Sequence, residues 1–180
     1  MRNEIIIGDE KFVPLIEEEK IQNRVIELGA QISEDYKGKL PILIGVLNGA
    51  FIFLADLVKN ISIHCEIDFL KLSSYGDQKI SSGNVRTLKE LNADINERHI
   101  IIVEDIVDTG LSLNYIKQIL NKFNPASIKF ASLLVKPESL KYDLKIDYIG
   151  FEILNKFVIG YGLDYAQKYR NLKSIYVLSN

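Results

Sequence analysis

The chain has 180 residues, 47% hydrophobic and 26% charged, which is the composition of a globular protein with a single core. Its 22 basic and 24 acidic residues leave a net charge of -2, so neither nucleic acid nor an acidic membrane is indicated as a partner. The single cysteine, Cys65, excludes an internal disulfide and a zinc site of several cysteines. No signal peptide opens the sequence and no apolar run approaches the ~18 residues of a membrane helix, so we expect a cytoplasmic protein.

Short apolar runs alternate with amphipathic segments along the chain. In chain order, we expect strands at 40–47, 62–72, 100–103, 127–135, 148–152 and 174–178, and helices over about 50–59 and 111–123. Between these, residues 73–98 contain serine, glycine and asparagine clusters that predict a long loop. The alternation predicts a mainly parallel sheet covered by helices on both faces, with ligands at the carboxyl ends of the strands.

The segment 99–114, HIIIVEDIVDTGLSLN, combines an apolar strand with three acidic residues. The strand is predicted to end at Glu104 and Asp105, and a turn from Asp108 to Ser112 precedes a helix. Backbone N–H groups and hydroxyls of such a turn can bind a phosphate without a basic side chain. The preceding acids can accept hydrogen bonds from sugar hydroxyls, and a divalent cation would offset the negative charge. This pattern favours a substrate with a terminal phosphate and a ribose diol.

Other phosphate-binding motifs are missing from the sequence. No glycine-rich loop ending in Lys and Ser or Thr occurs, which argues against a P-loop nucleotide hydrolase. Gly160-Tyr161-Gly162 lacks a third glycine at the spacing of a dinucleotide-binding loop.

The run VEDIVDTGLSL closely resembles the 5-phosphoribosyl 1-diphosphate motif of type I phosphoribosyltransferases. Four further segments, in the same order as in the family, resemble the hypoxanthine(-guanine) members: GVLNGAFIFLADL at 45–57, LSSYGDQ at 72–78, LLVKPESL at 133–140, and 147–172. The resemblance implies an α/β fold with a twisted, mainly parallel sheet flanked by helices. It also implies one domain over 1–180, with a core at about 38–135 and a small hood from about 1–20 and 136–180.

The implied activity is purine salvage by an enzyme. A 5-phosphoribosyl group would pass from 5-phospho-α-D-ribose 1-diphosphate to N9 of hypoxanthine and/or guanine, giving IMP or GMP and diphosphate. The implied cofactor is Mg²⁺, and the implied assembly is a homodimer or homotetramer. Two alternatives stay open: a regulator of the same fold that senses the sugar diphosphate and binds nucleic acid, and a transferase that prefers xanthine.

The resemblance also implies a role for each site residue. Leu47, Asn48 and Gly49 would bind the diphosphate, and Ser74 and Tyr75 would belong to a loop that closes over the site. Glu104 and Asp105 would face the ribose hydroxyls and, with Asp164, the metal. Thr109, Gly110, Leu111 and Ser112 would hold the 5-phosphate. Arg170 would contact the diphosphate.

The remaining implied roles concern the purine. Lys136 would donate to the oxygen at position 6, which disfavours adenine because an amino group there would leave the donor unpaired. Asp108 would lie near N7 as the acid or base. Phe157 would stack on the ring, and Val158 would present backbone groups to its edge.

Two positions depart from the family pattern. Asn48 stands where relatives often have a basic residue, so no cationic role is expected there. Leu111 replaces a lysine found in some relatives, which favours binding of the phosphate by backbone groups.

Overall fold

The computed structural model describes residues 4–74, 85–89 and 91–179. Its elements are β1 (Ile5–Ile7), β2 (Glu10–Ile16), α1 (Glu18–Asp35), β3 (Ile42–Leu47), α2 (Phe51–Lys59), β4 (Glu66–Ser74), β5 (Val85–Lys89), β6 (His99–Val107), α3 (Leu111–Leu120), the 3₁₀ turn η1 (Asn121–Phe123), β7 (Ser127–Val135), the 3₁₀ turn η2 (Pro137–Ser139), β8 (Tyr148–Glu152), β9 (Val158–Ile159) and β10 (Ile175–Ser179).

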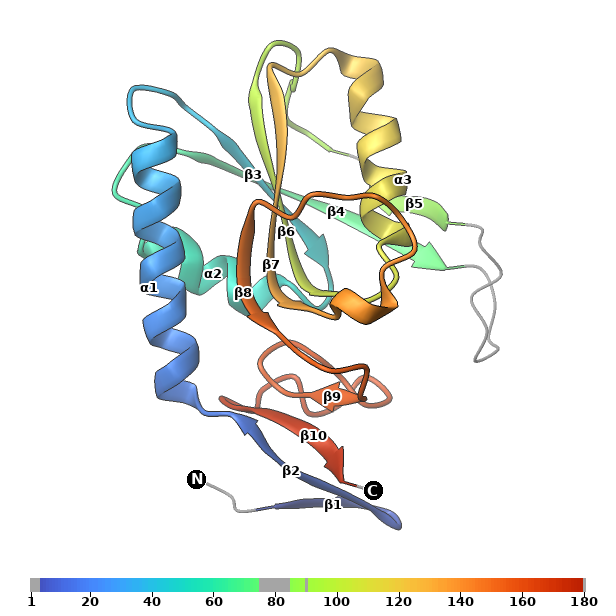
Figure 1. Ribbon diagram of the computed structural model, residues 1–180. Helices are drawn as coiled ribbons and strands as arrows, with labels where there is room; N and C mark the ends of the chain where they lie inside the picture. The colour runs from blue at the N-terminus through green and yellow to red at the C-terminus, as the bar shows by residue number, and fades with distance from the viewer. Residues whose placement is uncertain (1–3, 75–84, 90, 180) are drawn as a thin grey trace.

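Six strands form the central sheet, in the order β5-β4-β3-β6-β7-β8. All neighbours pair in parallel except β4 and β5, which are antiparallel. Helices α1 and α2 cover one face and α3 covers the other (Figure 1). The predicted α/β fold with a mainly parallel sheet flanked by helices is therefore confirmed.

Residue alternation in the strands explains the two layers of core. In β3 and β6, Ile42, Ile44, Ile100 and Ile102 pack with α3, while Leu43, Ile101 and Val103 pack with α1 and α2. Successive side chains of a strand point to opposite faces, so a strand covered on both faces must be apolar throughout. This accounts for the unbroken apolar run before Glu104.

A second, antiparallel sheet, β1-β2-β10-β9, forms the hood from the two ends of the chain. Register pairs include Phe12 with Leu178 and Tyr176 with Ile159. In Figure 1 the hood lies beyond the carboxyl ends of β3, β6 and β7. The residue bounds expected for the core, about 38–135, and for the hood stay a prediction. Strand β8 belongs to the central sheet although it lies in the segment expected to form the hood.

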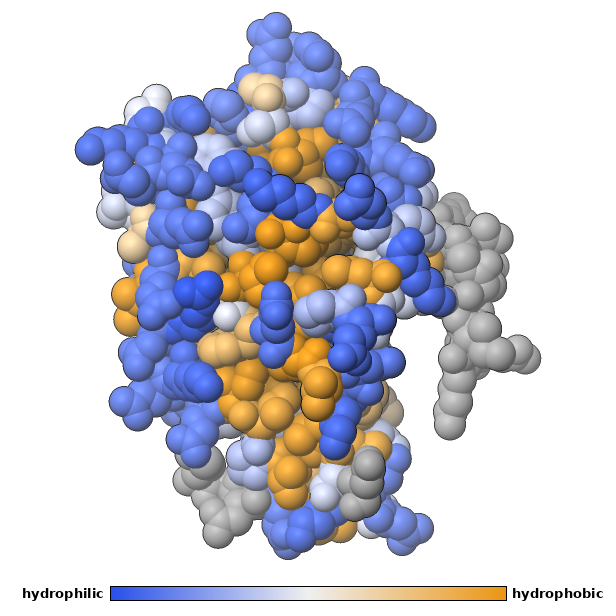
Figure 2. Space-filling model, in the orientation of Figure 1, coloured by the Kyte–Doolittle hydropathy of each residue, from blue (hydrophilic) through white to orange (hydrophobic). Residues whose placement is uncertain are grey.

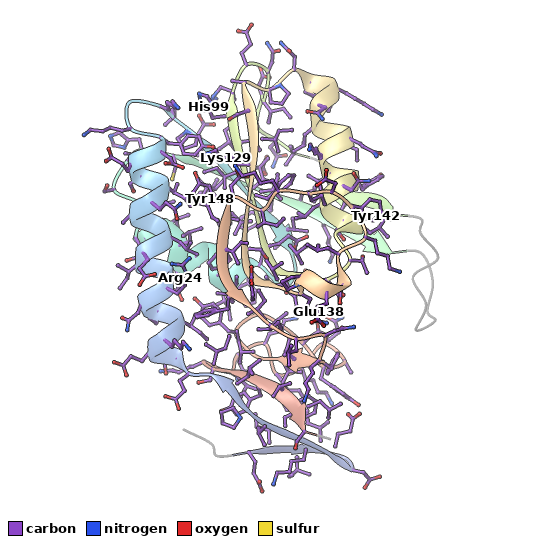
Figure 3. The ribbon with its side chains drawn as sticks, in the orientation of Figure 1. Arg24, His99, Lys129, Glu138, Tyr142 and Tyr148 are labelled. Carbon is purple, nitrogen blue, oxygen red and sulfur yellow. The ribbon has the colours of Figure 1, made fainter. Side chains whose placement is uncertain are left out.

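Polar contacts fasten α1 to the edge of the central sheet. Arg24 lies between α1 and β8 (Figure 3), and its guanidinium donates to the carbonyls of Ile149 at 2.7 Å and Gly150 at 3.1 Å. At the other end of the helix, Asp35 accepts from the Tyr148 hydroxyl at 2.6 Å and from the Lys129 ammonium at 3.1 Å. The Arg24 bonds satisfy backbone carbonyls of β8, the edge strand of the sheet, and the Asp35 bonds tie side chains of β7 and β8 to the end of α1.

Across the described part of the chain, no helix combines the length and apolarity that crossing a membrane requires.

Candidate active site

The loop after β3 packs closely against Asp105 of β6. Gly49 lies so close to Asp105 that a Cβ atom at Gly49 would be 1.6 Å from the Asp105 Oδ2. The Leu47–Asn48 peptide bond is cis, and α2 begins directly after the loop at Phe51. Leu47, Asn48 and Gly49 all line one cavity of about 480 Å³, a volume within the range of small-molecule sites.

Strand β6 continues past the point where the sequence predicted its end. It runs to Val107, and Glu104 pairs with Ser132 of β7. The prediction that Glu104 and Asp105 follow the strand is thus wrong, because the ladder is made by backbone groups and tolerates acidic side chains. Adjacent strand residues point to opposite faces, so the two neighbouring carboxyl groups diverge.

Burial perturbs both strand acids. Glu104 is buried, and burial followed by the charge of Asp105 raises the pKa of its carboxyl well above the usual range. Burial also raises the pKa of Asp105 to about 6. The Ile106 N–H, which donates to the Asp105 Oδ1 at 3.0 Å, acts in the opposite direction and lowers this pKa. Arg170 lowers the pKa of Asp105 and Asp164 raises it. Two carboxyl groups with perturbed pKa values in one cavity are typical of a functional site.

The turn from Asp108 to Ser112 forms a small cavity of about 110 Å³ at the start of α3. Gly110 adopts a left-handed conformation with φ of 80° immediately before the helix, and the Leu111 N–H donates to the Thr109 hydroxyl at 3.4 Å. No lysine or arginine of the described residues lines this cavity. The predicted phosphate turn therefore offers backbone N–H groups and hydroxyls at the positive end of a helix.

Lys136 and Asp108 form an ion pair. Lys136, at the end of β7, is only 7% exposed, and its Nζ lies 2.7 Å from the Asp108 Oδ2. A buried ammonium needs such a partner because burial without one is costly. The two side chains predicted to recognise the six-membered and five-membered parts of one purine edge are thus side by side.

Phe157 lies on the hood rather than in its core. The residue is 48% exposed, and its ring makes edge-to-face contacts with Phe12 at 6.2 Å and Tyr165 at 5.8 Å between ring centroids. Figure 2 shows that hydrophobic surface extends over this part of the molecule. Val158 is buried, and its strand pairs with β10. Neither Phe157 nor Lys136 lines the cavity of about 480 Å³, so the structure assembles the sugar-phosphate residues more closely than the purine residues.

Asp164 and Arg170 complete the wall of the larger cavity. The Arg170 Nη2 lies 2.7 Å from the Asp164 Oδ1, and its Nη1 donates to the carbonyl of Gly162 at 2.7 Å. The Gln167 N–H donates to the other Asp164 oxygen at 2.8 Å. The Arg170 guanidinium also donates to the Gln167 side-chain oxygen at 3.1 Å, so three partners hold it in a cavity that also contains Asp105.

The three carboxylates predicted to hold magnesium, Glu104, Asp105 and Asp164, all line this cavity. Among the described residues, however, no three metal-ligating side chains are grouped so as to hold an ion by themselves. Magnesium usually keeps several waters and binds one or two carboxylates together with substrate phosphates. The donors present fit a magnesium ion that is shared with a bound diphosphate.

Two predicted residues cannot be placed: Tyr75 and the side chain of Ser74 lie outside the part of the chain that the structure describes. Conversely, Gly162 was not predicted as a site residue. Its φ is +100°, and a Cβ there would be 2.1 Å from the Gly49 carbonyl oxygen. The signal was the glycine pair Gly160 and Gly162 within the segment 147–172, because glycines so close together can mark a close approach of backbones.

Comparisons with known proteins agree with this geometry. The family model for the phosphoribosyl transferase domain matches residues 16–166. The hypoxanthine-guanine phosphoribosyltransferase of Bacillus subtilis is 48% identical over 164 residues, which cover 91% of both chains. The enzyme of that name from Streptococcus thermophilus is 43% identical over the same shares.

Solved structures give the same result. A hypoxanthine-guanine phosphoribosyltransferase from Bacillus anthracis is 43% identical, with a TM-score of 0.88 and coverage of 92% of this chain and 98% of that one. A hypoxanthine phosphoribosyl transferase of Trypanosoma cruzi, studied for the role of its C-terminal region in oligomeric state and activity, is 41% identical, with a TM-score of 0.86 and coverage of 92% and 90%. The chain therefore belongs to the phosphoribosyltransferases, and within them to the transferases of the hypoxanthine-guanine group.

Proposed function

We propose that the protein transfers the 5-phosphoribosyl group from 5-phospho-α-D-ribose 1-diphosphate to N9 of hypoxanthine and/or guanine, with Mg²⁺ as cofactor. The observation that carries this proposal is the cavity of about 480 Å³, which is shared by the loop at Gly49, the acids of β6, the turn before α3 and the pair Asp164 and Arg170. In this proposal the loop at Gly49 and the pair Asp164 and Arg170 contact the diphosphate, the acids of β6 contact the ribose, and the turn before α3 contacts the 5-phosphate.

The sugar-phosphate half follows from the electrostatics of the cavity. The turn before α3 binds the 5-phosphate through N–H groups, and Glu104 and Asp105 accept from the ribose hydroxyls. Arg170 donates to the departing diphosphate, for which a planar guanidinium is well suited. Asp105 and Asp164, with Glu104 beside them, would hold magnesium, which when bound offsets the charge of the diphosphate.

The purine half follows from the ion pair of Lys136 and Asp108. The ammonium donates to the oxygen at position 6, and the carboxylate accepts from N7–H. As N9 bonds to the anomeric carbon, the bond from that carbon to the diphosphate oxygen breaks, and the proton of N7 passes to Asp108. Nearby carboxylates stabilise the cationic character that the ribose gains in the transition state.

Product analysis tests this function directly. The protein is incubated with Mg²⁺, the sugar diphosphate and one of hypoxanthine, guanine, xanthine or adenine, and the nucleotides are separated. We expect IMP or GMP as the main product. A main product of AMP would contradict the role of Lys136, XMP would favour the xanthine alternative, and no nucleotide from any base would refute the enzyme proposal.

Assembly and location are parts of the same proposal. We propose a homodimer or homotetramer that acts in the cytoplasm on small-molecule substrates. Sedimentation equilibrium of the purified protein tests the assembly, and a mass equal to one chain at every concentration would contradict it.

A further inference from the structure

The loop that carries Asp164 contacts the loop at 47–49, here called the diphosphate loop, through the backbones of Gly162 and Gly49. Gly162 leaves no room for a side chain, because a Cβ atom there would lie 2.1 Å from the Gly49 carbonyl oxygen. On its other side, the Gly162 carbonyl accepts from Arg170 at 2.7 Å. A small shift of this loop would therefore move Arg170 and Asp164 away from the loop at Gly49.

Tyr161 precedes Gly162 in that loop. It is 3% exposed and adopts a left-handed backbone conformation with φ of 50°, which a bulky residue rarely adopts unless its surroundings enforce it. Its N–H donates to the Leu172 carbonyl at 2.8 Å, and its hydroxyl donates to the Asp56 Oδ2 at 2.7 Å. Of these two bonds, only the one from the Tyr161 hydroxyl joins the C-terminal segment to α2, the helix that packs on the central sheet.

Asp56 is well placed to anchor Tyr161. It lies in α2, the helix that starts immediately after the diphosphate loop. The same Oδ2 also accepts from the Gln22 side chain of α1 at 3.1 Å, and Oδ1 lies 3.0 Å from the Lys59 ammonium on the solvent side. One carboxylate thus connects α1, α2 and the hood.

We propose that Asp56 and Tyr161 are positioning residues for the sugar diphosphate: their hydrogen bond holds the loop carrying Asp164 against the diphosphate loop. Neither side chain lines the cavity of about 480 Å³, so both act through Gly162, Asp164 and Arg170. The inference rests on the proposed function, since it concerns the site for the same substrate.

Four variants test the proposal: Tyr161→Phe, which keeps the ring and removes the hydroxyl; Asp56→Leu; Asp56→Asn, which keeps an oxygen acceptor; and the double variant Tyr161→Phe with Asp56→Leu. The control is Lys59→Ala, which removes an exposed partner of the same carboxylate. The measurements are the dissociation constant of the sugar diphosphate with Mg²⁺ by calorimetry, KM for each substrate, and the thermal unfolding midpoint.

We expect Tyr161→Phe and Asp56→Leu each to weaken binding of the sugar diphosphate by about 10-fold, the loss typical of one hydrogen bond to a charged group. The double variant should lose no more affinity for the sugar diphosphate than the single variant that binds it more weakly, because both substitutions remove the same hydrogen bond. KM for the purine should stay within about twofold. Lys59→Ala should bind like the unmodified protein, and Asp56→Asn, which keeps an oxygen acceptor without the charge, should lose less binding than Asp56→Leu.

The proposal is overturned if Tyr161→Phe binds the sugar diphosphate normally, even when its unfolding midpoint falls, since the bond would then only stabilise the fold. Additive losses in the double variant would also overturn it. Should Asp56→Leu fail to fold, Tyr161→Phe alone decides. If the unmodified protein makes nucleotide and Tyr161→Phe binds the sugar diphosphate normally, this inference alone is refuted. If the unmodified protein neither binds the sugar diphosphate nor makes nucleotide, both this inference and the proposed function are refuted.

Discussion

Replacing Gly49 with alanine should separate the assembly of the site from the stability of the fold. The added Cβ would lie 1.6 Å from the Asp105 Oδ2. An ordinary carbon to oxygen contact is about 3.3 Å, so the loop or the carboxylate must move by about 1.7 Å. Gly49 does not have a left-handed backbone conformation, so the contact alone, and not backbone strain, opposes the substitution.

The size of the effect follows from this displacement. Forcing an extra methyl group into a packed site costs about 1–3 kcal/mol of stability, while a misplacement of about 1 Å in a catalytic site lowers the rate by about 100-fold. We therefore expect kcat/KM for the sugar diphosphate to fall by about 100-fold while the protein stays folded. Thermal unfolding and steady-state kinetics of the same preparation measure both quantities.

The matched control is Gly45→Ala in β3. Its Cβ would meet the Leu54 Cδ2 at 2.7 Å and the Phe69 Cδ1 at 3.2 Å, which are ends of core side chains rather than site atoms. We expect a similar loss of stability with nearly normal turnover by the folded fraction. Turnover of Gly49→Ala within about fivefold of the unmodified protein, or an equal loss in Gly45→Ala, would refute the reasoning.

Three further predictions concern the purine edge and the outer end of α1. Asp108→Ala should slow turnover by the folded fraction by about 100-fold, measured by single-turnover kinetics, and it should also lower the unfolding midpoint because buried Lys136 loses its partner; normal turnover would leave Asp108 only a positioning role. Lys136→Gln, whose amide offers both a donor and an acceptor, should lower the ratio of kcat/KM for hypoxanthine to that for adenine, and an unchanged ratio would contradict the role of Lys136. The hydrogen bonds from Tyr148 and then Lys129 hold the pKa of Asp35 below its usual value of about 3.9. A depressed carboxyl pKa stabilises the fold fully above about pH 4, and this stability is lost as the pH falls through the lowered pKa. Asp35→Asn should therefore lower the unfolding midpoint at pH 7, and the difference from the unmodified protein should shrink towards pH 3; a constant difference would show that charge is not its cause.

Elements bounded by clear turn residues were predictable from sequence alone. The strands expected at 127–135 and 148–152 coincide with β7 and β8. The helix expected over 111–123 is divided into α3 and the 3₁₀ turn η1, which has no buried residue to hold a further α-helical turn against the core. The local sequence pattern therefore predicted which helices and strands exist more reliably than the residues at which they end.

Other elements were missed for identifiable reasons. β5 lies at 85–89, inside the segment expected to be loop, and its pairing with β4 depends on backbone groups that composition does not report. The end of β6 was placed too early because acids replaced apolar residues in a strand whose ladder continues. For α1, no prediction was made, although its buried residues recur at helical spacing.

The candidate site residues could be proposed from sequence because they lie in short local stretches, such as 104–112. The contact of Gly162 with Gly49 and the bond of Tyr161 to Asp56 join residues far apart in the chain. Such contacts depend on how the hood is placed on the central sheet. No periodicity or local motif encodes that placement, so it became visible only in the folded chain.

The pairing of β2 with β10 bears on the order in which the molecule assembles. It joins Phe12 to Leu178, so nearly the whole chain forms the loop that this pairing closes. Closing so long a loop costs entropy before any contact compensates for it, and strands close in sequence pair faster. During refolding, we expect the central sheet with its phosphate turn to form first and the hood, which supports the Phe157 ring through Phe12, to form last. In the proposed function, a refolding chain would then gain its contacts to the 5-phosphate before its contacts to the base.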